Sequence, residues 1–175
     1  MSGALSFRNA GMDDIDAIVA LVESAYRGDA SRRGWTTEAD LLDGRRTGVD
    51  EVTACLQRPR SRLVMAERDG AMLACAHVAE EDGAGYFGMF SVDPGRQGEG
   101  IGKQVLAEAE RIVRDEWALP AMRMTVIDVR DELIAFYERR GYRRTGILKP
   151  FPYGDARFGL PRRDDLRFEV LEKNL

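Results

Sequence analysis

Apolar residues near the start of the chain recur at helical spacing between residues 15 and 26. Residues three and four apart share one face of a helix, so this pattern predicts an amphipathic helix. Asp13 and Asp14 would begin it, because short carboxylates accept hydrogen bonds from free backbone N–H groups. A short strand is predicted just before, over residues 5–8.

Two more helices are predicted before the central strands. Thr36 or Thr37 would cap a helix that reaches about Arg46, and Asp50 would cap the next one. This last helix should end before Pro59, because the residue before a proline disfavours helical backbone.

Strand-like runs follow at residues 63–66, 72–79 and 86–92. Asp69-Gly70 and Asp82-Gly83 separate them, and Asp-Gly is typical of tight hairpin turns. Three antiparallel strands therefore lead towards a long amphipathic helix. Its apolar face comprises Ile101, Val105, Leu106, Ala109, Ile112, Val113 and Trp117.

Beyond Pro120 the pattern predicts a strand over residues 122–127 and a helix from Asp131 to Gly141. Closing strands are predicted over 142–145 and 166–171. The order of elements indicates a mixed α/β fold with one central strand–loop–helix–strand crossover. The length of 175 residues is typical of one domain, so we expect residues 1–175 to form a single unit.

The segment SVDPGRQGEGIGK, residues 91–103, joins the third of the central strands to the long helix. Glycine allows sharp turns and lets a ligand approach the backbone closely. The first turn of a helix has unpaired N–H groups and partial positive charge, and both favour phosphate. The segment therefore predicts a site for a phosphorylated cofactor.

Two well-known phosphate loops do not fit this segment. A Walker A loop has Ser or Thr after Gly-Lys, whereas Gln104 follows Gly102-Lys103 here. The dinucleotide fingerprint has a third glycine three residues after the second, and that position is Lys103 or Val105 in this chain.

The remaining pattern, Gln97-x-x-Gly100-x-Gly102 after Val92-Asp93-Pro94, resembles the acetyl-CoA pyrophosphate loop of the GNAT superfamily of N-acetyltransferases. Downstream, FYERRGY over residues 136–142 resembles the second hallmark of the family, an aromatic pair on a helix closed by Gly-Tyr. The resemblance extends from about residue 5 to about residue 172. It implies an α/β (α+β mixed) fold with a central mixed, mostly antiparallel twisted sheet of about six to seven strands, flanked by helices.

The resemblance also implies where acetyl-CoA, the co-substrate, would bind. Backbone groups of one strand would pair with the pantetheine arm, and N–H groups of the loop would line the pyrophosphate. Arg96 and Lys103 would attract the phosphates or be plain surface cations, while we expect Glu99 to point to solvent. Many members carry Asn seven residues before the tyrosine, whereas Arg130 stands there in this chain and either replaces that contact or faces water. The implied cofactor-binding residues are Phe90, Ser91, Val92, Gln97, Gly98, Gly100, Ile101, Gly102, Lys103 and Arg130.

Acetyl transfer to an amine requires a deprotonated amine and a proton donor for the leaving thiolate. The resemblance implies Tyr137 as this donor, with packing of its ring in the core as the alternative. Glu80 is the candidate general base, because it ends a strand that flanks the expected cleft. His77 and Asp128 are further candidates, with a packed histidine and a solvated aspartate as the alternatives. No cysteine is placed for a covalent acyl-enzyme, and the reaction requires no metal.

Charge and cysteine content narrow the class of protein. The 26 basic and 30 acidic residues give a net charge of −4, unlike the basic excess of nucleic-acid-binding domains. No apolar run reaches the length of a membrane span, and we expect no signal peptide. Cys55 and Cys75 lack metal or redox spacing. We therefore expect a cytoplasmic protein with no nucleic-acid or membrane partner.

The acceptor is expected to be a small-molecule or peptide amine that attacks acetyl-CoA directly. The oligomeric state stays open, and a homodimer is one option. The alternatives are a non-catalytic acyl-CoA-binding module and a protein-directed acetyltransferase subunit. Four aromatic residues would either shape an acceptor pocket or anchor a loop. These are Trp35, Phe151, Tyr153 and Phe158.

Overall fold

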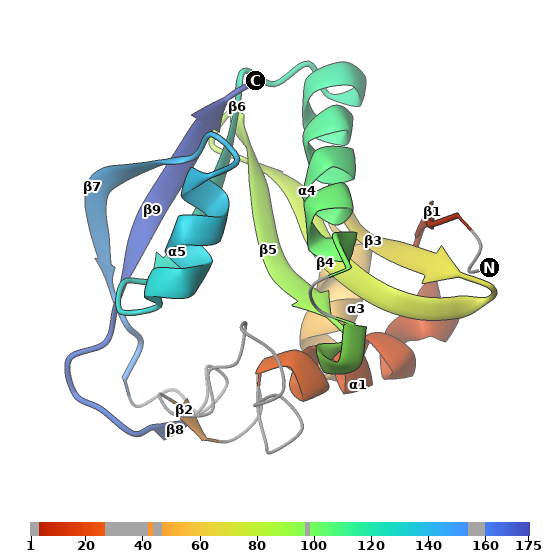
Figure 1. Cartoon of the computed structure of the whole chain (residues 1–175), viewed down its shortest axis with the longest axis horizontal. Helices are drawn as coiled ribbons and strands as arrows, with labels where there is room; N and C mark the ends of the chain where they lie inside the picture. Colours follow the sequence, from red (N-terminus) through yellow and green to blue (C-terminus); the bar gives the residue numbers. More distant parts are fainter. Residues whose placement is uncertain (1–3, 27–41, 44–46, 97–98, 154–159) are drawn as a thin grey trace.

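A seven-stranded sheet with the order β1-β3-β4-β5-β6-β9-β7 forms the centre of the computed structural model (Figure 1). The structure describes residues 4–26, 42–43, 47–96, 99–153 and 160–175. All neighbouring strands in this sheet are antiparallel except β5 and β6, which are parallel. The predicted mixed, mostly antiparallel sheet is therefore confirmed.

The strands of the large sheet are β1 (Ser6–Asn9), β3 (Ser61–Arg68), β4 (Ala71–Glu81), β5 (Ala84–Val92), β6 (Ala121–Ile127), β7 (Arg143–Pro150) and β9 (Arg167–Asn174). The strands β2 (Leu42–Asp43) and β8 (Leu160–Pro161) form a separate two-stranded sheet. The α-helices are α1 (Ile15–Tyr26), α3 (Val49–Gln57), α4 (Ile101–Arg111) and α5 (Asp131–Glu138). Within the described residues, no helix is long and apolar enough to cross a bilayer.

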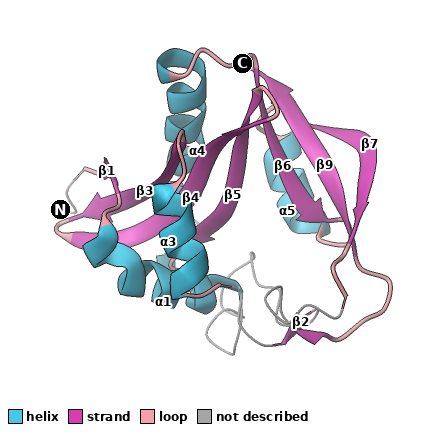
Figure 2. Ribbon diagram, turned by 180° about the vertical axis from the view of Figure 1, so that it is seen from behind, coloured by secondary structure: helices cyan, strands magenta, loops and turns pink. Residues whose placement is uncertain are grey.

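Helices cover both faces of the sheet, with α4 and α5 on one side and α1 and α3 on the other (Figures 1 and 2). The alternation of side chains along β3 explains how one strand serves both layers. Val64 and Ala66 belong to the core under α4 and α5, whereas Leu63 and Met65 belong to the core under α1 and α3. Each layer thus buries one stripe of the same strand.

The two predicted Asp-Gly hairpins are confirmed. Asp69 and Gly70 have φ values of 53° and 80°, and Asp82 and Gly83 have φ values of 53° and 77°. Positive φ at both central residues defines a type I′ turn, whose twist matches that of the flanking strands. These turns set the register of β3, β4 and β5.

The parallel strands β5 and β6 pair at one end only. Their register covers Gly85 with Met122 and Tyr86 with Arg123, and beyond these pairs the strands separate (Figure 1). A bulge between Cys75 and His77 interrupts the β4–β5 pairing, and on β5 Met89 has a φ of 51°. The separation leaves space between two strands of one sheet, on the side that α5 covers.

Several predicted helix boundaries were wrong. Asp13 and Asp14 lie in a 3₁₀ turn, Met12–Asp14, that precedes α1, and the Asp14 carboxylate accepts a hydrogen bond from the Gly11 N–H at 2.8 Å. Gly48, not Asp50, occupies the N-cap of α3. An extended β-region backbone at that cap places Asp50 in the first turn, where a carboxylate still interacts well with the helix dipole.

The prediction of a helix reaching Arg46 was wrong for residues 42–43, because they form the strand β2 and pair with β8. Its proposed caps, Thr36 and Thr37, lie outside the described residues. The long helix, by contrast, stops before Pro120 as predicted: a π-helical turn, Ile112–Glu116, continues α4 beyond Arg111.

Replacing Gly85 by Ala should destabilise the fold at the single point where β5 and β6 pair. An added Cβ would lie 2.6 Å from both γ-carbons of Val113, which is fully buried. We expect a loss of about 1–3 kcal/mol in the free energy of unfolding, measured in urea. Gly11→Ala is the matched control, because its Cβ would meet only Asp14 at 4.0 Å. Equal losses in the two variants would contradict this account.

Candidate active site

The glycine loop ends in a left-handed residue that starts α4. Gly100 is the N-cap, with a φ of 77°, and a Cβ there would meet no atom within 4 Å. The first N–H groups of α4 have no partner within the helix, and they belong to Ile101, Gly102 and Lys103. Gly102 has another role, since its Cβ would lie 2.8 Å from Cζ of Phe90 and would push α4 away from β5.

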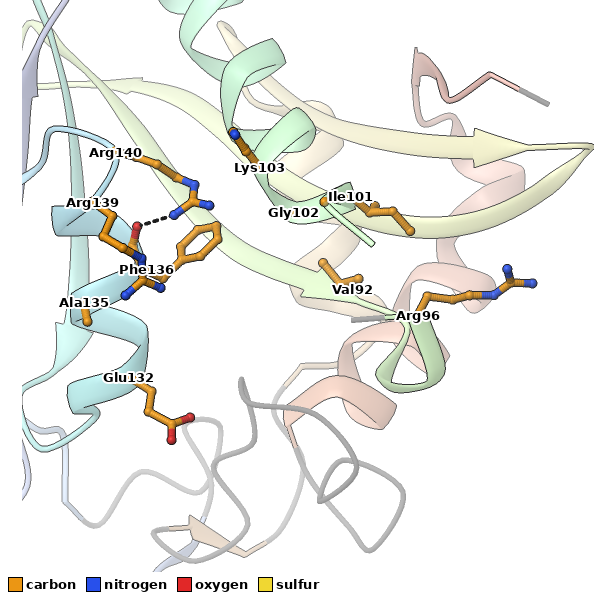
Figure 3. Close-up of a pocket in the computed structure, with 11 residues that line it drawn as sticks. Val92, Arg96, Ile101, Gly102, Lys103, Glu132, Ala135, Phe136, Arg139 and Arg140 are labelled. Atoms are coloured by element: carbon orange, nitrogen blue, oxygen red, sulfur yellow. Dashed lines mark hydrogen bonds between the residues drawn. The ribbon is translucent and has the colours of Figure 1, made fainter. Parts of the chain in front are cut away.

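A cavity of about 470 Å³ lies between this loop and α5 (Figure 3). We call it the loop cavity. The loop residues Gly100 to Lys103 form one wall, and Phe136, Arg139 and Arg140 of α5 form the other. Arg96 and Lys103 also line it, so both cations predicted near the phosphates lie at the cavity. Four cations and the free N–H groups outweigh the one lining carboxylate, Glu132, so the loop cavity is suited to an anion.

The rest of the predicted loop comprises Gln97, Gly98 and Glu99. Gln97 and Gly98 lie outside the described residues. Glu99 is exposed, as expected, and its carboxylate also pairs with Arg68 of β3 at 3.3 Å. This pair ties the loop to the sheet and keeps the Glu99 carboxylate from competing freely for the nearby cations.

A second cavity, of about 270 Å³, occupies the space where β5 and β6 separate, and we call it the strand cavity. Tyr137 of α5 lines it, and only 4% of this residue is exposed. Burial is the main cause that raises the pKa of the Tyr137 hydroxyl well above its usual value, and the nearby Arg130 cation opposes the shift. The phenol is therefore protonated near neutral pH, which is the form that can donate a proton.

The consecutive residues Phe136 and Tyr137 line different cavities. Phe136 lines the loop cavity and Tyr137 the strand cavity, while Phe90 of β5 contacts both rings, at 5.9 Å and 6.4 Å between centroids. The aromatic pair that the sequence singled out thus separates a site suited to phosphate from a buried hydroxyl. Packing of Tyr137 in the core, the alternative at the sequence level, is also observed, so packing and a role in the site coexist.

The strand residues Phe90, Ser91 and Val92 are all buried between the helices. Ser91 donates its hydroxyl proton to the Met89 carbonyl at 3.1 Å. The Phe90 carbonyl accepts a hydrogen bond from the hydroxyl of Tyr26, at the end of α1. Sequence reasoning missed Tyr26, because its helical spacing assigned it only to the core.

Arg130 is buried, so the predicted alternative that it faces water was wrong. It is 9% exposed at the N-cap of α5, and its guanidinium carbon lies 5.6 Å from the ring centroid of Tyr26. Both residues line the strand cavity with Tyr137. The contact of Arg130 with the cofactor remains a prediction.

The predicted general bases are held by other groups. The Glu80 carboxylate pairs with Arg60 at 2.6 Å, and Glu80 lines neither cavity. Asp128 pairs with Arg167. The assignment of Glu80 as base therefore remains a prediction that the two cavities do not support.

His77 lines the strand cavity, but both of its ring nitrogens have partners. The Ser61 hydroxyl donates to the Cys55 carbonyl at 2.6 Å, so its oxygen accepts the proton of His77 Nε2 at 2.7 Å. Nδ1 is then the acceptor, 3.7 Å from the Cys55 sulfur. Burial, followed by the charge of Arg58, lowers the pKa of His77 to about 4. A neutral histidine with both nitrogens bonded is a packed one rather than a base.

The predicted aromatic cluster divides between the two roles considered for it. Phe151 lines the strand cavity, and its ring lies 5.5 Å from that of Phe168, which the sequence did not indicate. Tyr153 anchors its loop, because its hydroxyl donates to the Arg163 carbonyl and accepts the Leu166 N–H. Trp35 and Phe158 lie outside the described residues. Among the residues that the structure describes, no group of three or more His, Cys, Asp or Glu is placed to hold a metal ion.

A family model described as "Acetyltransferase (GNAT) family" matches residues 20–142 of the chain. This range contains the glycine loop, β5, β6 and all of α5. No curated protein has a sequence that matches the chain.

Many solved structures share the fold at low sequence identity. The ribosomal-protein-alanine N-acetyltransferase of Brucella melitensis is 18% identical, with a TM-score of 0.73 over 97% of this chain and 99% of that one. The spermidine/spermine N-acetyltransferase SpeG of Vibrio cholerae, crystallised as mutant forms, is 13% identical, with a TM-score of 0.67 over 98% and 95%. A Bacillus anthracis protein solved in complex with acetyl coenzyme A is 15% identical, with a TM-score of 0.58 over 70% and 67%.

The buried state of His77 predicts a specific loss of stability in acid. The pKa of His77 is about 4 in the folded chain, against an unperturbed value of 6.5. The unfolded chain therefore binds more protons between these values, and the stability present above pH 6.5 falls as the pH drops to 4, by about 3 kcal/mol. His77→Gln removes this contribution, so urea unfolding across this range should show a shallower pH dependence than wild type. Parallel pH profiles would contradict the assignment.

Proposed function

Because the chain belongs to the acetyltransferase (GNAT) family, we propose that it is an N-acetyltransferase that moves the acetyl group of acetyl-CoA to a primary amine. The observation that carries the proposal is the position of Phe136 and Tyr137 at two adjoining cavities. One cavity has free helix N–H groups and cations, and the other has a buried phenol. A phosphorylated thioester needs both kinds of site within reach of one molecule.

The residues of this chain fit acetyl-CoA in two respects. Gly100 leaves open space at the start of α4, so a phosphate can approach the N–H groups of Ile101, Gly102 and Lys103. The buried backbone of Phe90, Ser91 and Val92 follows β5 past the aromatic pair and would hold the pantetheine arm. Gln97, Gly98 and Arg130 complete the proposed contacts. When bound, acetyl-CoA supplies a thioester, which an amine can attack directly.

Tyr137 would donate its proton to the sulfur of CoA as the thioester breaks. Its raised pKa keeps the hydroxyl protonated at neutral pH, and only 4% of the residue is exposed. A positioned acid of this kind typically accelerates a reaction by about 10²–10⁴-fold. The base for the amine is assigned to Glu80 only as a prediction from the sequence, since its carboxylate pairs with Arg60.

Acceptors of two classes are consistent with the fold. Structures that share it include an N-acetyltransferase for a ribosomal protein and one for spermidine and spermine. A protein-directed enzyme is therefore the second candidate for this chain, and a non-catalytic acyl-CoA-binding module is the third. Thiol release from acetyl-CoA across a panel of primary amines, amino acids and peptides separates them. Turnover of small amines supports the proposal, turnover of peptides alone favours the second candidate, and binding without turnover favours the third.

Tyr137→Phe should lower kcat by about 10²-fold or more while the Kd of acetyl-CoA stays within about twofold, because only the proton donor is removed. Tyr142→Phe is the matched control. Its hydroxyl donates to Glu110 at 2.8 Å, and Tyr142 lines neither cavity, so this variant should keep its kcat. Stopped-flow thiol release and calorimetry give the two constants. Equal kcat values for the Tyr137→Phe variant and wild type would exclude the role as acid.

A further inference from the structure

Two cations at the loop cavity, Arg139 and Arg140, differ from many other arginines in that they pair with no carboxylate among the described residues. On the sheet and on the far side of α4, arginines pair with acidic residues, as in Arg60 with Glu80 and Arg111 with Glu108. Within the described part of the chain, no ion pair includes Arg139 or Arg140, although both line the cavity. Glu132 also lines the cavity, so four cations face a single carboxylate there, and this excess of positive charge suits an anionic ligand.

Arg140 is the most constrained of these cations. Its Nη1 donates to the Phe136 carbonyl at 2.8 Å, and its guanidinium carbon lies 3.8 Å from the centroid of the Phe136 ring. Figure 3 shows the guanidinium extended over that ring. The Nε atom is buried and has no hydrogen-bond partner. Burial lowers the pKa of Arg140, followed by the charge of Arg139.

Because Nε is buried, a ligand can reach Arg140 only at its Nη atoms. The stacking on Phe136 fixes the plane of the guanidinium, and the bond to the Phe136 carbonyl fixes its rotation. The remaining N–H groups are then oriented before any ligand arrives. An arginine fork held in this way matches the geometry of a phosphate group.

We propose that Arg140, assisted by Arg139, binds the ribose 3′-phosphate of coenzyme A and makes this chain selective for CoA over carriers that lack that phosphate. The proposal rests on the proposed function, which places the diphosphate on the N–H groups of the loop. Arg140 lies on the opposite wall of the same cavity and is left for the third phosphate. A phosphate monoester carries a charge near −2 at neutral pH, which two adjacent arginines balance.

The test compares the affinities of CoA and 3′-dephospho-CoA, measured by calorimetry for wild type and Arg140→Gln. We expect wild type to bind CoA at least about tenfold more tightly than 3′-dephospho-CoA. In the Arg140→Gln variant, CoA should lose most of this advantage, while the affinity for 3′-dephospho-CoA stays within about twofold. Arg114→Gln is the matched control for net charge, because Arg114 is exposed and pairs with Asp115 at the end of the helix.

The outcomes separate this inference from the proposed function. A collapse of the preference in the Arg140→Gln variant alone supports the assignment. Equal weakening of both ligands, or an unchanged preference, overturns it and leaves the acetyltransferase proposal intact. If wild type binds neither ligand, the proposed function fails as well. Arg140→Lys replaces the glutamine variant should that one not fold, and losing the fork should still lower the preference at least about threefold.

Discussion

The candidate site depends on the separation of two parallel strands after only two register pairs. The register pairing of β5 with β6 ends at Tyr86 and Arg123, so beyond these residues the two strands no longer pair with each other. Unpaired backbone and the space beside it are costly in a core. In this chain α5 covers the gap, and Tyr137, Leu133 and Arg130 reach into it. The break in the sheet is thus the feature that creates a binding site.

The aromatic cluster of Phe90, Phe136 and Tyr137 packs between the two cavities. Phe90 lies nearly parallel to Phe136 and is tilted against Tyr137, and Gly102 leaves room for its ring below α4. The start of α4, the middle of β5 and one face of α5 therefore meet at a single side chain. Because packed cores are stiff, the distance from the loop to the phenol is fixed by this contact. A ligand that spans both cavities would find its two ends already placed.

Local patterns in the sequence predicted the elements well, and contacts distant in sequence account for what they missed. The face of α4 and the Asp-Gly turns follow from spacing and from the φ preferences of a few residues. The pairing of His77 with Ser61 and Cys55, by contrast, depends on how β3 and α3 meet β4. The contacts of Glu99 with Arg68 and of Tyr26 with the Phe90 carbonyl also join residues that are distant in sequence. The sequence could therefore indicate the glycine loop and Tyr137, but not the contacts that surround them.

Amide hydrogen exchange with and without acetyl-CoA tests the central claim most directly, because it reads the N–H groups at the start of α4 one peptide at a time. The account predicts that saturating acetyl-CoA slows exchange at Ile101, Gly102 and Lys103. The turn at Asp69-Gly70, remote from both cavities, should exchange as before. Unchanged exchange at the start of α4 in the presence of bound acetyl-CoA would contradict the account.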